Sequence, residues 1–507
     1  MNESYWILSS EGQRFKKLEE DLEIDTLIIG GGIVGVTTAY LLAKKGIQTA
    51  IVDANKIGYG SSGRNTGKIT SQHGIIYSKI SEKYNLESAK LYYEGNNRAI
   101  NLIDEIVREN NIDCNFERIS SYIFTENENY LQELKDEYDT CKKIGVESVY
   151  YDNLDIPFNV KGAIEFVNQA QFNPKKYIDS LLNICIDLGV KVYENTPIVN
   201  YEKDDKYELK TKEQKSINAL NVVLASHFPF YDGLNLYFSK EKADRSYLVC
   251  GEYNSKIPRG MYLNVDESGI TFKTYEEGNK KLIIAGGGDH KVGQCKDEGE
   301  IYPKLEEKFK EKFNVEKFDY RWSAQDYISF DNVPYIGYIN KNEDNIYVAT
   351  GFCKWGMSNG TLAAMIIRDL ICYRESKYEK LFNPSRKKNL LTTEFFIENI
   401  NVVMNYIEGK IQIEDEKLPI IKGEGKPIKI KGKRYGAYRD YDDNIYILDI
   451  TCTHLGCELK FNSAEKTWDC PCHASRFDYK GNVIEGPALR NLKLYGKGKN
   501  DIDPKLI

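Results

Sequence analysis

Two cysteines and two histidines near the end of the chain have the spacing of a metal site. Cys452 and His454 form a C-x-H motif, Cys470 and His473 form a C-x-x-H motif, and 15 residues separate the two. Thiolates and imidazoles bind borderline metals, so a structural zinc ion is one interpretation. An iron–sulfur cluster is the other. Either way, two loops must bring these ligands together.

The residues around the two motifs favour the iron–sulfur interpretation. The segments Cys452–Cys457, Cys470–Ser475 and Gly481–Pro487 resemble the Rieske proteins of respiratory cytochrome complexes. The resemblance implies that the two cysteines and two histidines bind a [2Fe–2S] cluster. It also implies a disulfide between Cys457 and Cys472 that ties the two ligand loops.

Hydrogen-bond donors near such a cluster set its potential. Ser475 matches a hydroxyl donor of these Rieske proteins, whereas Phe477 stands where they have a tyrosine that donates to a ligand sulfur. Donors stabilise the reduced, more negative cluster. With one donor kept and one lost, we expect a potential below the top of the Rieske range of about −150 to +300 mV.

A second constellation, near residue 30, has the chemistry of nucleotide binding. An apolar strand over residues 26–29 runs into glycines on the G-x-G-x-x-G spacing, a helix follows to Gly46, and a second strand ends in an acid. In such a unit the glycines allow a tight turn and close approach of a pyrophosphate, helix amides hold the phosphate charge, and the acid binds a ribose hydroxyl. The alternative is a strand-to-helix turn without a ligand. The expected cofactor-binding residues are Gly30, Gly32, Ile33, Gly35 and Asp53.

Two further stretches could approach the same cofactor. Residues 58–70 are rich in glycine and hydroxyls, although a plain surface loop has the same composition. Residues 346–360 read as a strand, a glycine turn and a helix start, which could place a helix N-terminus at a flavin ring or be an ordinary turn. The candidates are Ser61, Ser62, Asn65, Thr66 and Gly67 in the first stretch, and Gly351, Gly356, Met357 and Ser358 in the second.

Together with the residue-30 unit, these motifs resemble the D-amino-acid oxidase family, which includes glycine and sarcosine oxidases. The resemblance covers about the first 380 residues and also includes residues 168–174, 321–326 and 331–337. It implies FAD rather than NAD. It also implies oxidation of a C–N bond by hydride transfer to the flavin, giving an imine that water hydrolyses.

One position departs from that family. Its amino-acid-oxidising members hold the substrate carboxylate with an arginine, and alignment on Trp322 and Asp331 places Asp326 there. A carboxylate in the cavity would favour a cationic amine. The alternatives are that Asp326 caps a turn or pairs with Arg321.

No catalytic residue is certain from the sequence. Four residues are candidates by location only: His290, Asp326, Lys354 and Trp355. Lys354 could stabilise a reduced flavin or be a solvent-exposed lysine. His290 follows three glycines that suggest a cavity turn, and a hydrogen-bonded core histidine is the alternative.

The expected fold has three parts. They are an α/β Rossmann-like FAD-binding domain, a substrate domain built on an antiparallel sheet, and a small all-β Rieske domain. The sequence places the FAD-binding domain at 1–80, 150–232 and 330–390, the substrate or cap domain at 81–149 and 233–329, a linking helix at 391–410, and the Rieske domain at 411–507.

Composition narrows the cellular setting. The chain has 507 residues and a net charge of −7 with both signs interspersed, which argues against a nucleic-acid surface. It has no long apolar run to span a membrane and no secretory signal, so we expect a cytoplasmic protein. Seven scattered cysteines are expected to be buried, reduced thiols: Cys114, Cys141, Cys185, Cys250, Cys295, Cys353 and Cys372.

The two expected cofactors suggest a protein that couples a two-electron oxidation to one-electron transfer. Hydride chemistry delivers two electrons to a flavin, whereas a [2Fe–2S] cluster takes one at a time. The leading hypothesis is an amine or amino-acid dehydrogenase that passes electrons through the cluster to an external one-electron carrier. The alternatives are an oxygen-using amine oxidase whose Rieske domain is structural or regulatory, and a redox sensor or electron carrier without an amine substrate.

Overall fold

The structure is a computed structural model that divides the chain into two compact units. It describes residues 3–203, 206–231, 236–254, 256–267, 269–386, 393–411, 420–430 and 432–499. The large unit comprises Met1–Asn235, Ser246–Asp289 and Leu305–Lys387. The small unit comprises Leu236–Arg245, His290–Lys304 and Lys388–Ile507. Each unit is described by itself below.

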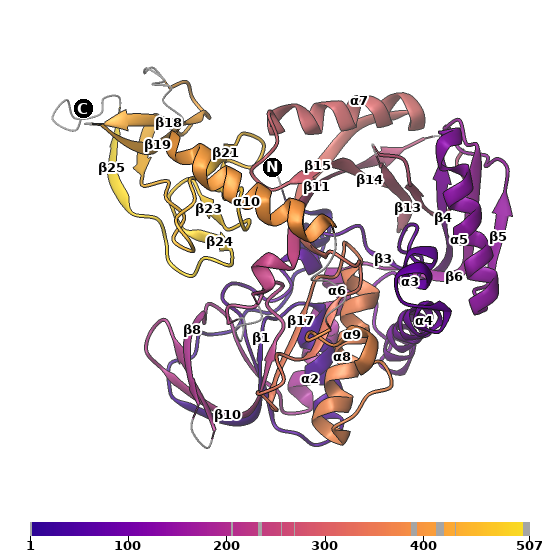
Figure 1. The fold of residues 1–507 in the computed structure, drawn as a ribbon, viewed down its shortest axis with the longest axis horizontal. Coiled ribbons are helices and arrows are strands. Elements are labelled where there is room, and N and C mark those ends of the chain that lie inside the picture. Colours follow the sequence, from indigo (N-terminus) through magenta and orange to yellow (C-terminus); the bar gives the residue numbers. More distant parts are fainter. Residues whose placement is uncertain are drawn as a thin grey trace. The chain divides into compact units, whose positions relative to one another are not determined.

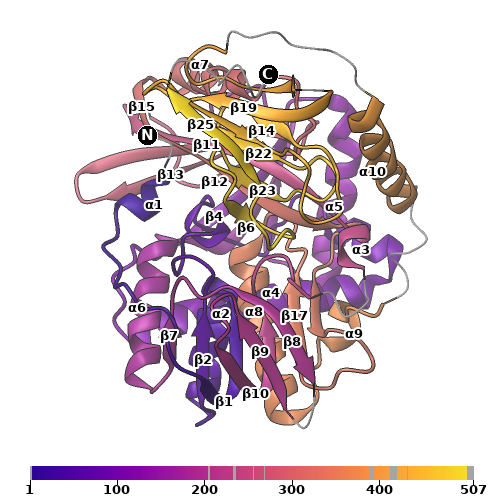
Figure 2. The same cartoon turned by 90° about the vertical axis from the view of Figure 1, so that its left-hand side faces the viewer.

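The first sheet of the large unit, sheet A, carries the predicted nucleotide turn. Its order is β16-β17-β10-β1-β2-β7, with the β8–β9 hairpin attached to β10 (Figure 2). The central strands β17, β10, β1, β2 and β7 run parallel. Chain order reverses beside β1, since β2 lies on one side and the late strand β10 on the other, and ligands bind at such switch points. The strands are β1 (Leu22–Ile29), β2 (Thr49–Val52), β7 (Lys191–Tyr193), β8 (Ile198–Lys203), β9 (Tyr207–Thr211), β10 (Ser216–Leu224), β16 (Tyr335–Tyr338) and β17 (Ile346–Thr350).

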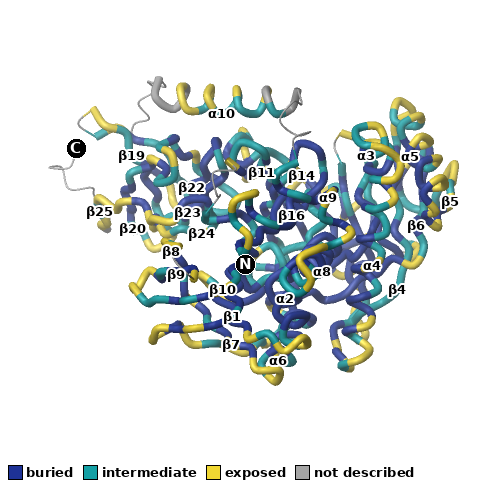
Figure 3. Tube along the Cα trace, turned by 60° about the horizontal axis from the view of Figure 1, so that its bottom comes forward, coloured by how far each residue is buried: buried dark blue, intermediate teal, exposed yellow. Residues whose placement is uncertain are grey.

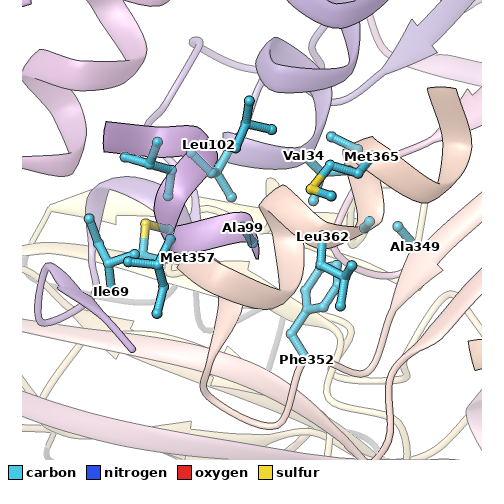
Figure 4. Close-up of a cluster of buried hydrophobic side chains, with 14 of the residues drawn as sticks. Val34, Ile69, Ala99, Leu102, Ala349, Phe352, Met357, Leu362 and Met365 are labelled. Carbon is cyan, nitrogen blue, oxygen red and sulfur yellow. The ribbon is translucent and has the colours of Figure 1, made fainter. Parts of the chain in front are cut away.

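Helices of the large unit bury this sheet. Helix α2 is apolar on nearly all sides and packs against both α6 and α8, which is why it is almost wholly buried. Figure 4 shows the core that results, with Val34 of α2, Ala99 of α4 and Leu362 of α8 among its side chains. Figure 3 shows the burial along β1 and β10, whose last three residues are buried in both strands. The helices are α1 (Tyr5–Leu8), α2 (Ile33–Ala43), α3 (Tyr77–Lys83), α4 (Leu86–Glu109), α5 (Leu131–Ile144), α6 (Pro174–Asp187), α7 (Ile301–Phe313), α8 (Gly356–Tyr373) and α9 (Glu379–Phe382).

The second sheet of the large unit, sheet B, is mostly antiparallel, as predicted. Its order is β15-β11-β14-β13-β12-β4-β6-β3, with β5 on β6, and β12 runs parallel to β4. The strands are β3 (Lys68–Ile69), β4 (Glu117–Thr125), β5 (Ser148–Tyr151), β6 (Gly162–Gln171), β11 (Glu241–Tyr253), β12 (Met261–Asn264), β13 (Thr271–Glu277), β14 (Lys280–Lys291) and β15 (Val315–Ser329).

The glycines at 286–288 do not form a cavity turn, so one of the two interpretations of His290 is wrong. Strand β14 runs through them to Lys291. A Cβ on Gly286 would lie 3.1 Å from the carbonyl oxygen of Tyr247, and one on Gly287 would lie 3.2 Å from a methyl of Leu305. Gly286 and Gly287 therefore allow close packing inside a strand, whereas Gly288 is exposed and has φ +68°, a conformation that favours glycine.

The small unit contains two four-stranded antiparallel sheets and helix α10 (Figure 1). The sheet orders are β18-β19-β20-β25 and β21-β22-β23-β24. Val402 of α10 packs against the hydrophobic core that contains Cys452 and Cys470. The elements are α10 (Thr393–Ile411), β18 (Gly425–Ile430), β19 (Lys433–Arg439), β20 (Asn444–Leu448), β21 (Lys460–Asn462), β22 (Thr467–Asp469), β23 (Arg476–Asp478), β24 (Val483–Glu485) and β25 (Leu494–Lys499). None of the helices in the described residues combines the length and apolar character needed to cross a bilayer.

The prediction of seven buried thiols is only partly right. Four of the cysteines are buried, whereas Cys295, Cys353 and Cys372 are partly exposed. Cys295 lies in the loop after β14, Cys353 in the turn before α8, and Cys372 in the last turn of α8. Loops and helix ends lie near the surface, which explains the difference.

A buried ion pair fixes the end of the large unit, and its removal should be costly. Arg386 makes two hydrogen bonds to Asp331, at 2.8 and 2.9 Å, and also donates to the carbonyl of Pro334. Both side chains are almost fully buried. Replacing Asp331 by alanine would leave the guanidinium without its counter-charge, so the free energy of unfolding should fall by about 3–5 kcal/mol. Urea titration of the variant would measure the loss.

The same pair predicts a pH dependence. Burial raises the pKa of Asp331, but Arg386 more than offsets this, and the net pKa lies below the ordinary value. The pair should therefore stabilise fully above pH about 3.9 and progressively less as pH falls through the lowered native pKa. Asp319→Ala, which removes an exposed pair with Lys317, is the matched control and should change neither quantity measurably. Equal losses in both variants would contradict the argument.

Candidate functional site

The turn after β1 has the geometry that the glycine spacing predicts. Gly30 has φ +111°, a conformation that favours glycine, and a Cβ there would lie 2.4 Å from the carbonyl oxygen of Ala225 at the end of β10. A Cβ on Gly35 would lie 1.9 Å from the carbonyl oxygen of Gly30. Helix α2 begins at Ile33, and its N-cap residue, Gly32, has no side chain to cap it. Its first amides and the close-packed turn suit a phosphate group.

The acid at the end of β2 is tied to this turn. Asp53 accepts hydrogen bonds from the backbone amides of Gly31 at 2.8 Å and Asn55 at 2.7 Å. Burial raises its pKa, and these two amides oppose the rise. Asp53 therefore fixes the glycine turn at Gly31 through a hydrogen bond. A hydrogen bond from a ribose hydroxyl to Asp53 remains a prediction.

The hydroxyl-rich loop lies against the start of α2. The backbone amide of Ile33 donates to Ser62 Oγ at 3.0 Å. Asn65 binds its own loop, since its side chain donates to the carbonyl of Ser62 at 2.7 Å and accepts from the amide of Gly67. Thr66 is partly buried beside them. The loop is therefore ordered around the nucleotide turn rather than being a free surface segment.

The start of α8 contains a polar network that sequence reasoning missed. His73 is buried, with Nδ1 2.7 Å from the hydroxyl of Tyr92 and Nε2 3.0 Å from Ser358 Oγ. Its ring stacks on Trp355 with centroids 4.8 Å apart. Burial lowers its pKa to about 3, so it is neutral. His73 follows the hydroxyl-rich loop directly in sequence, and that position was the available signal.

The cofactor candidates of the second stretch lie in the turn between β17 and α8 and in the first residues of α8. Gly351 has φ +71° at the end of β17, and α8 begins at Gly356. Met357 and Ser358 are buried. Lys354 pairs with Asp289 at 2.8 Å, which makes it neither isolated nor simply solvated.

Asp326 has a partner that the sequence did not suggest. His227 Nε2 lies 3.1 Å from its Oδ1, and His227 Nδ1 lies 3.4 Å from Ser61 Oγ. Arg321 instead pairs with Glu306, so the alternative Asp326–Arg321 pair is wrong. His227 follows β10, and the end of that strand lies at the switch point.

Two buried lysines in sheet B were also missed. Lys68 Nζ donates to the carbonyl of Tyr262 at 2.8 Å, and Lys273 Nζ donates to the carbonyl of Gly67 at 3.3 Å. Burial lowers the pKa of Lys68 to about 7, and burial together with the nearby Lys68 lowers the pKa of Lys273 well below its ordinary value. Lys273 thus places an amine at the loop expected to hold the cofactor.

In the small unit, the four predicted metal ligands come together. The rings of His454 and His473 have centroids 5.2 Å apart at an interplanar angle of 90°. Cys452 and Cys470 are buried, reduced and hydrogen-bonded to each other, and this bond lowers the pKa of Cys452 and raises that of Cys470. Phe238 packs edge-on against His473 at 5.0 Å and against His454 at 6.0 Å.

These residues fit an iron–sulfur cluster. His473 Nδ1 is buried without a hydrogen-bond partner among the described residues, and burial lowers the pKa of His473 to about 3. An imidazole held neutral with an unpaired nitrogen is ready to ligate a metal. Each loop contributes one cysteine and one histidine, the two thiols contact each other and the two imidazoles contact each other, which matches the ligand division of a Rieske cluster.

The structure locates the predicted disulfide and the two residues that we expect to affect the potential. The predicted disulfide is confirmed, with the Cα atoms of Cys457 and Cys472 6.5 Å apart. Ser475 hydrogen-bonds to Cys452, and Phe477 is fully buried. The effect of these two residues on the potential stays a prediction.

Removing the disulfide should destabilise the ligand loops. It closes a separation of 15 residues, and such a cross-link is worth about 3 kcal/mol. Cys472→Ser should lower the stability of the small unit by that order and hasten loss of cluster absorbance on heating. Cys457→Ser should cost the same, and the double variant no more than either, because all three lose one bond. Additive losses would show that the cysteines act separately.

His290, a catalytic candidate, belongs to the small unit. One ligand atom from each of His290, Cys295 and Glu298 lies within 4.8 Å of the others. The sequence interpretation gave Cys295 only as a buried thiol and gave Glu298 no role. A histidine, a cysteine and an acid within nine residues were the overlooked signal.

Comparison with known proteins identifies two domains in the chain. Residues 25–370 match the FAD dependent oxidoreductase (DAO) family model, and residues 411–496 match the Rieske [2Fe-2S] domain model. The chain is 40% identical over 493 residues to the Rieske 2Fe-2S iron-sulfur protein YhfW of Bacillus subtilis (strain 168), covering 97% of each chain. It is 22% identical over 390 residues to gamma-glutamylputrescine oxidoreductase of Escherichia coli (strain K12), covering 73% of this chain and 88% of the relative.

Among solved structures, glycine oxidase from Geobacillus kaustophilus has the same fold. The TM-score is 0.61 at 17% identity, and the match covers 72% of this chain and 99% of the oxidase. The shared region is the FAD part, with its mixed and antiparallel sheets. The chain belongs to the DAO family of FAD-dependent oxidoreductases and carries in addition a Rieske [2Fe–2S] domain, so its cofactors are FAD and a [2Fe–2S] cluster.

Proposed function

We propose that this protein is a dehydrogenase that oxidises a C–N bond of an amine or amino acid and delivers the electrons one at a time to an external carrier. The observation that carries the proposal is the presence, in one chain, of a flavin fold and a complete two-cysteine, two-histidine cluster site. Bound FAD would accept a hydride from the carbon next to nitrogen, and the cluster would pass the resulting two electrons on singly. The imine product would be hydrolysed by water.

We assign the two steps to different sheets of the large unit. Sheet A would hold FAD at the carboxyl ends of β1 and β10, where Gly30, Gly35 and the Ser62–Ile33 contact lie. Sheet B would provide the substrate part. The predicted boundary between these parts remains a proposal, as does the boundary of the Rieske domain at 411.

The substrate class follows from one substitution and two relatives. Asp326 stands where amino-acid-oxidising members of the family have an arginine, and its carboxylate is paired with His227. A carboxylate favours a cationic group over a second carboxylate. Gamma-glutamylputrescine oxidoreductase is named for an amine derived from a diamine, whereas glycine oxidase is named for an α-amino acid and supports only the broader C–N class. We therefore propose an amine with a second cationic group ahead of a simple α-amino acid.

Anaerobic mixing with a panel of amines tests the proposal. The full chain, with both cofactors bound, would be mixed with mono- and diamines, N-methylated amines and amino acids. Flavin absorbance and the electron paramagnetic resonance (EPR) signal of the reduced cluster would be followed together. A substrate should bleach the flavin first and then produce the cluster signal without oxygen.

Each other outcome identifies a rival function. Bleaching of the flavin with a cluster that stays oxidised, followed by rapid reoxidation in air, would indicate an oxidase whose cluster is structural or regulatory. A flavin that no amine reduces but a reduced carrier protein does would indicate an electron carrier or sensor. Preference for α-amino acids over diamines would contradict the proposed role of Asp326 in substrate choice, but not the proposed dehydrogenase reaction.

A further inference from the structure

A group of three potential metal ligands lies in the small unit apart from the cluster residues. His290 is at the end of β14, Cys295 is in the loop that follows, and Glu298 begins a short 3-10 turn, Glu298–Glu300. One ligand atom from each lies within 4.8 Å of the other two. The set offers one imidazole nitrogen, one thiol sulfur and one carboxylate oxygen.

Glu298 is placed as a ligand rather than as a surface acid. Its residue exposure is 6%, and none of the ion pairs within the described residues involves it. A buried carboxyl either stays protonated or binds a compensating cation, and here it lies beside an imidazole and a thiol that could share such a cation.

We propose that His290, Cys295 and Glu298 bind a divalent cation of the zinc class. Nitrogen, sulfur and carboxylate oxygen are the ligands that zinc accepts, and a mixed set disfavours magnesium and calcium, which take oxygen. Zinc bonds of about 2.0–2.3 Å in a tetrahedron place ligand atoms about 3.3–3.8 Å apart. The ligand atoms of His290, Cys295 and Glu298 lie within 4.8 Å of one another, so small side-chain movements would bring them to that geometry. Three protein ligands leave the fourth position to water.

The proposed metal would fix the loop at residues 292–297, which in turn contacts the loop that carries cluster ligands Cys470 and His473. Gln294, next to Cys295, donates from its side-chain amide to the carbonyl of Pro471 at 3.1 Å. Gly293 packs so closely that a Cβ there would lie 2.9 Å from the nitrogen of Pro471. Pro471 separates cluster ligand Cys470 from disulfide-bonded Cys472. A metal at residues 290–298 would therefore hold this support in place, independently of any substrate.

Metal analysis of the full chain tests the site. The protein, expressed with iron and zinc in the medium and purified without chelators, should contain zinc equimolar with the chain in addition to cluster iron. Zinc K-edge absorption should show one sulfur and otherwise nitrogen or oxygen neighbours. The conservative variants Cys295→Ser and Glu298→Gln should lose most of this zinc while retaining FAD and the cluster EPR signal.

Matched controls separate this site from incidental binding. Cys372→Ser removes another partly exposed thiol, and Glu300→Gln removes an exposed acid two residues from Glu298; both should keep zinc equimolar. Zinc with two sulfur neighbours that disappears in His473→Ala would place the metal in the cluster site and overturn the proposal. Absence of zinc even after equilibration with zinc chloride would also overturn it. Neither result bears on the dehydrogenase proposal, which the amine panel tests separately.

Discussion

Replacement of His473 by alanine is expected to abolish the [2Fe–2S] cluster while leaving FAD bound. His473 lies against His454 with its Nδ1 buried and unpaired among the described residues, so no other group there replaces the lost ligand. Removing even an outer partner of a metal ligand costs about 10–100-fold in affinity, and removing the ligand itself should cost more. Iron and sulfide analysis should show loss of both, and the EPR signal of the reduced cluster should vanish.

Turnover distinguishes the roles of the two centres. If electrons leave through the cluster, His473→Ala should still allow an amine to bleach the flavin, but steady-state reduction of a one-electron acceptor should fall about a hundredfold or more. Lys480→Ala, which changes an exposed residue of the same domain, should behave as the unmodified protein. An unchanged cluster signal in His473→Ala would show that other residues bind the iron.

The sites that sequence reasoning located are those built from local spacing. The glycines at 30, 32 and 35 lie in one turn, and each pair of cluster ligands lies within four residues. In both cases the backbone geometry of one short segment determines where the functional groups point. The helix Pro174–Asp187 was predictable for the same reason, since Asn173 caps its first amides.

The parts that were missed depend on contacts between distant segments. Asp326 pairs with His227, 99 residues earlier, and Arg321 with Glu306 of α7, so the nearest opposite charge in sequence was the wrong partner. Lys68 and Lys273 are buried although lysine is almost never fully buried, and nothing in their flanking residues signals it. Such pairings follow from the order of strands in a sheet, which a single sequence does not specify.

Glycine runs show the same limit. In the sequence alone, Gly286–Gly288 and Gly30–Gly32 look alike, since each run follows an apolar segment typical of a strand. The first run continues a strand packed against Tyr247 and Leu305, whereas the second ends one at a helix. The residues that follow decide the outcome: an apolar helix follows Gly32, and polar residues follow Gly288.

Replacement of Gly35 by alanine is expected to remove FAD. The added Cβ would lie 1.9 Å from the carbonyl oxygen of Gly30, a backbone atom that cannot rotate away. Helix α2 would have to move from β1, and its first amides would move away from the phosphate site. Overpacking of this kind costs about 3 kcal/mol, which corresponds to a loss in FAD affinity on the order of a hundredfold. The ratio of flavin absorbance to protein after purification, and titration of apoprotein with FAD, would measure it.

A graded series separates this effect from general misfolding. A Cβ on Gly32 would meet only Ser62 Oγ, at 2.8 Å, and this side chain can rotate, so Gly32→Ala should bind FAD more weakly than the unmodified protein but better than Gly35→Ala. Gly60→Ala meets no atom within 4 Å and should bind FAD normally. The cluster EPR signal should persist in all three variants, because the Rieske domain has its own core. Normal FAD binding by Gly35→Ala would mean that the cofactor lies elsewhere than at the end of β1.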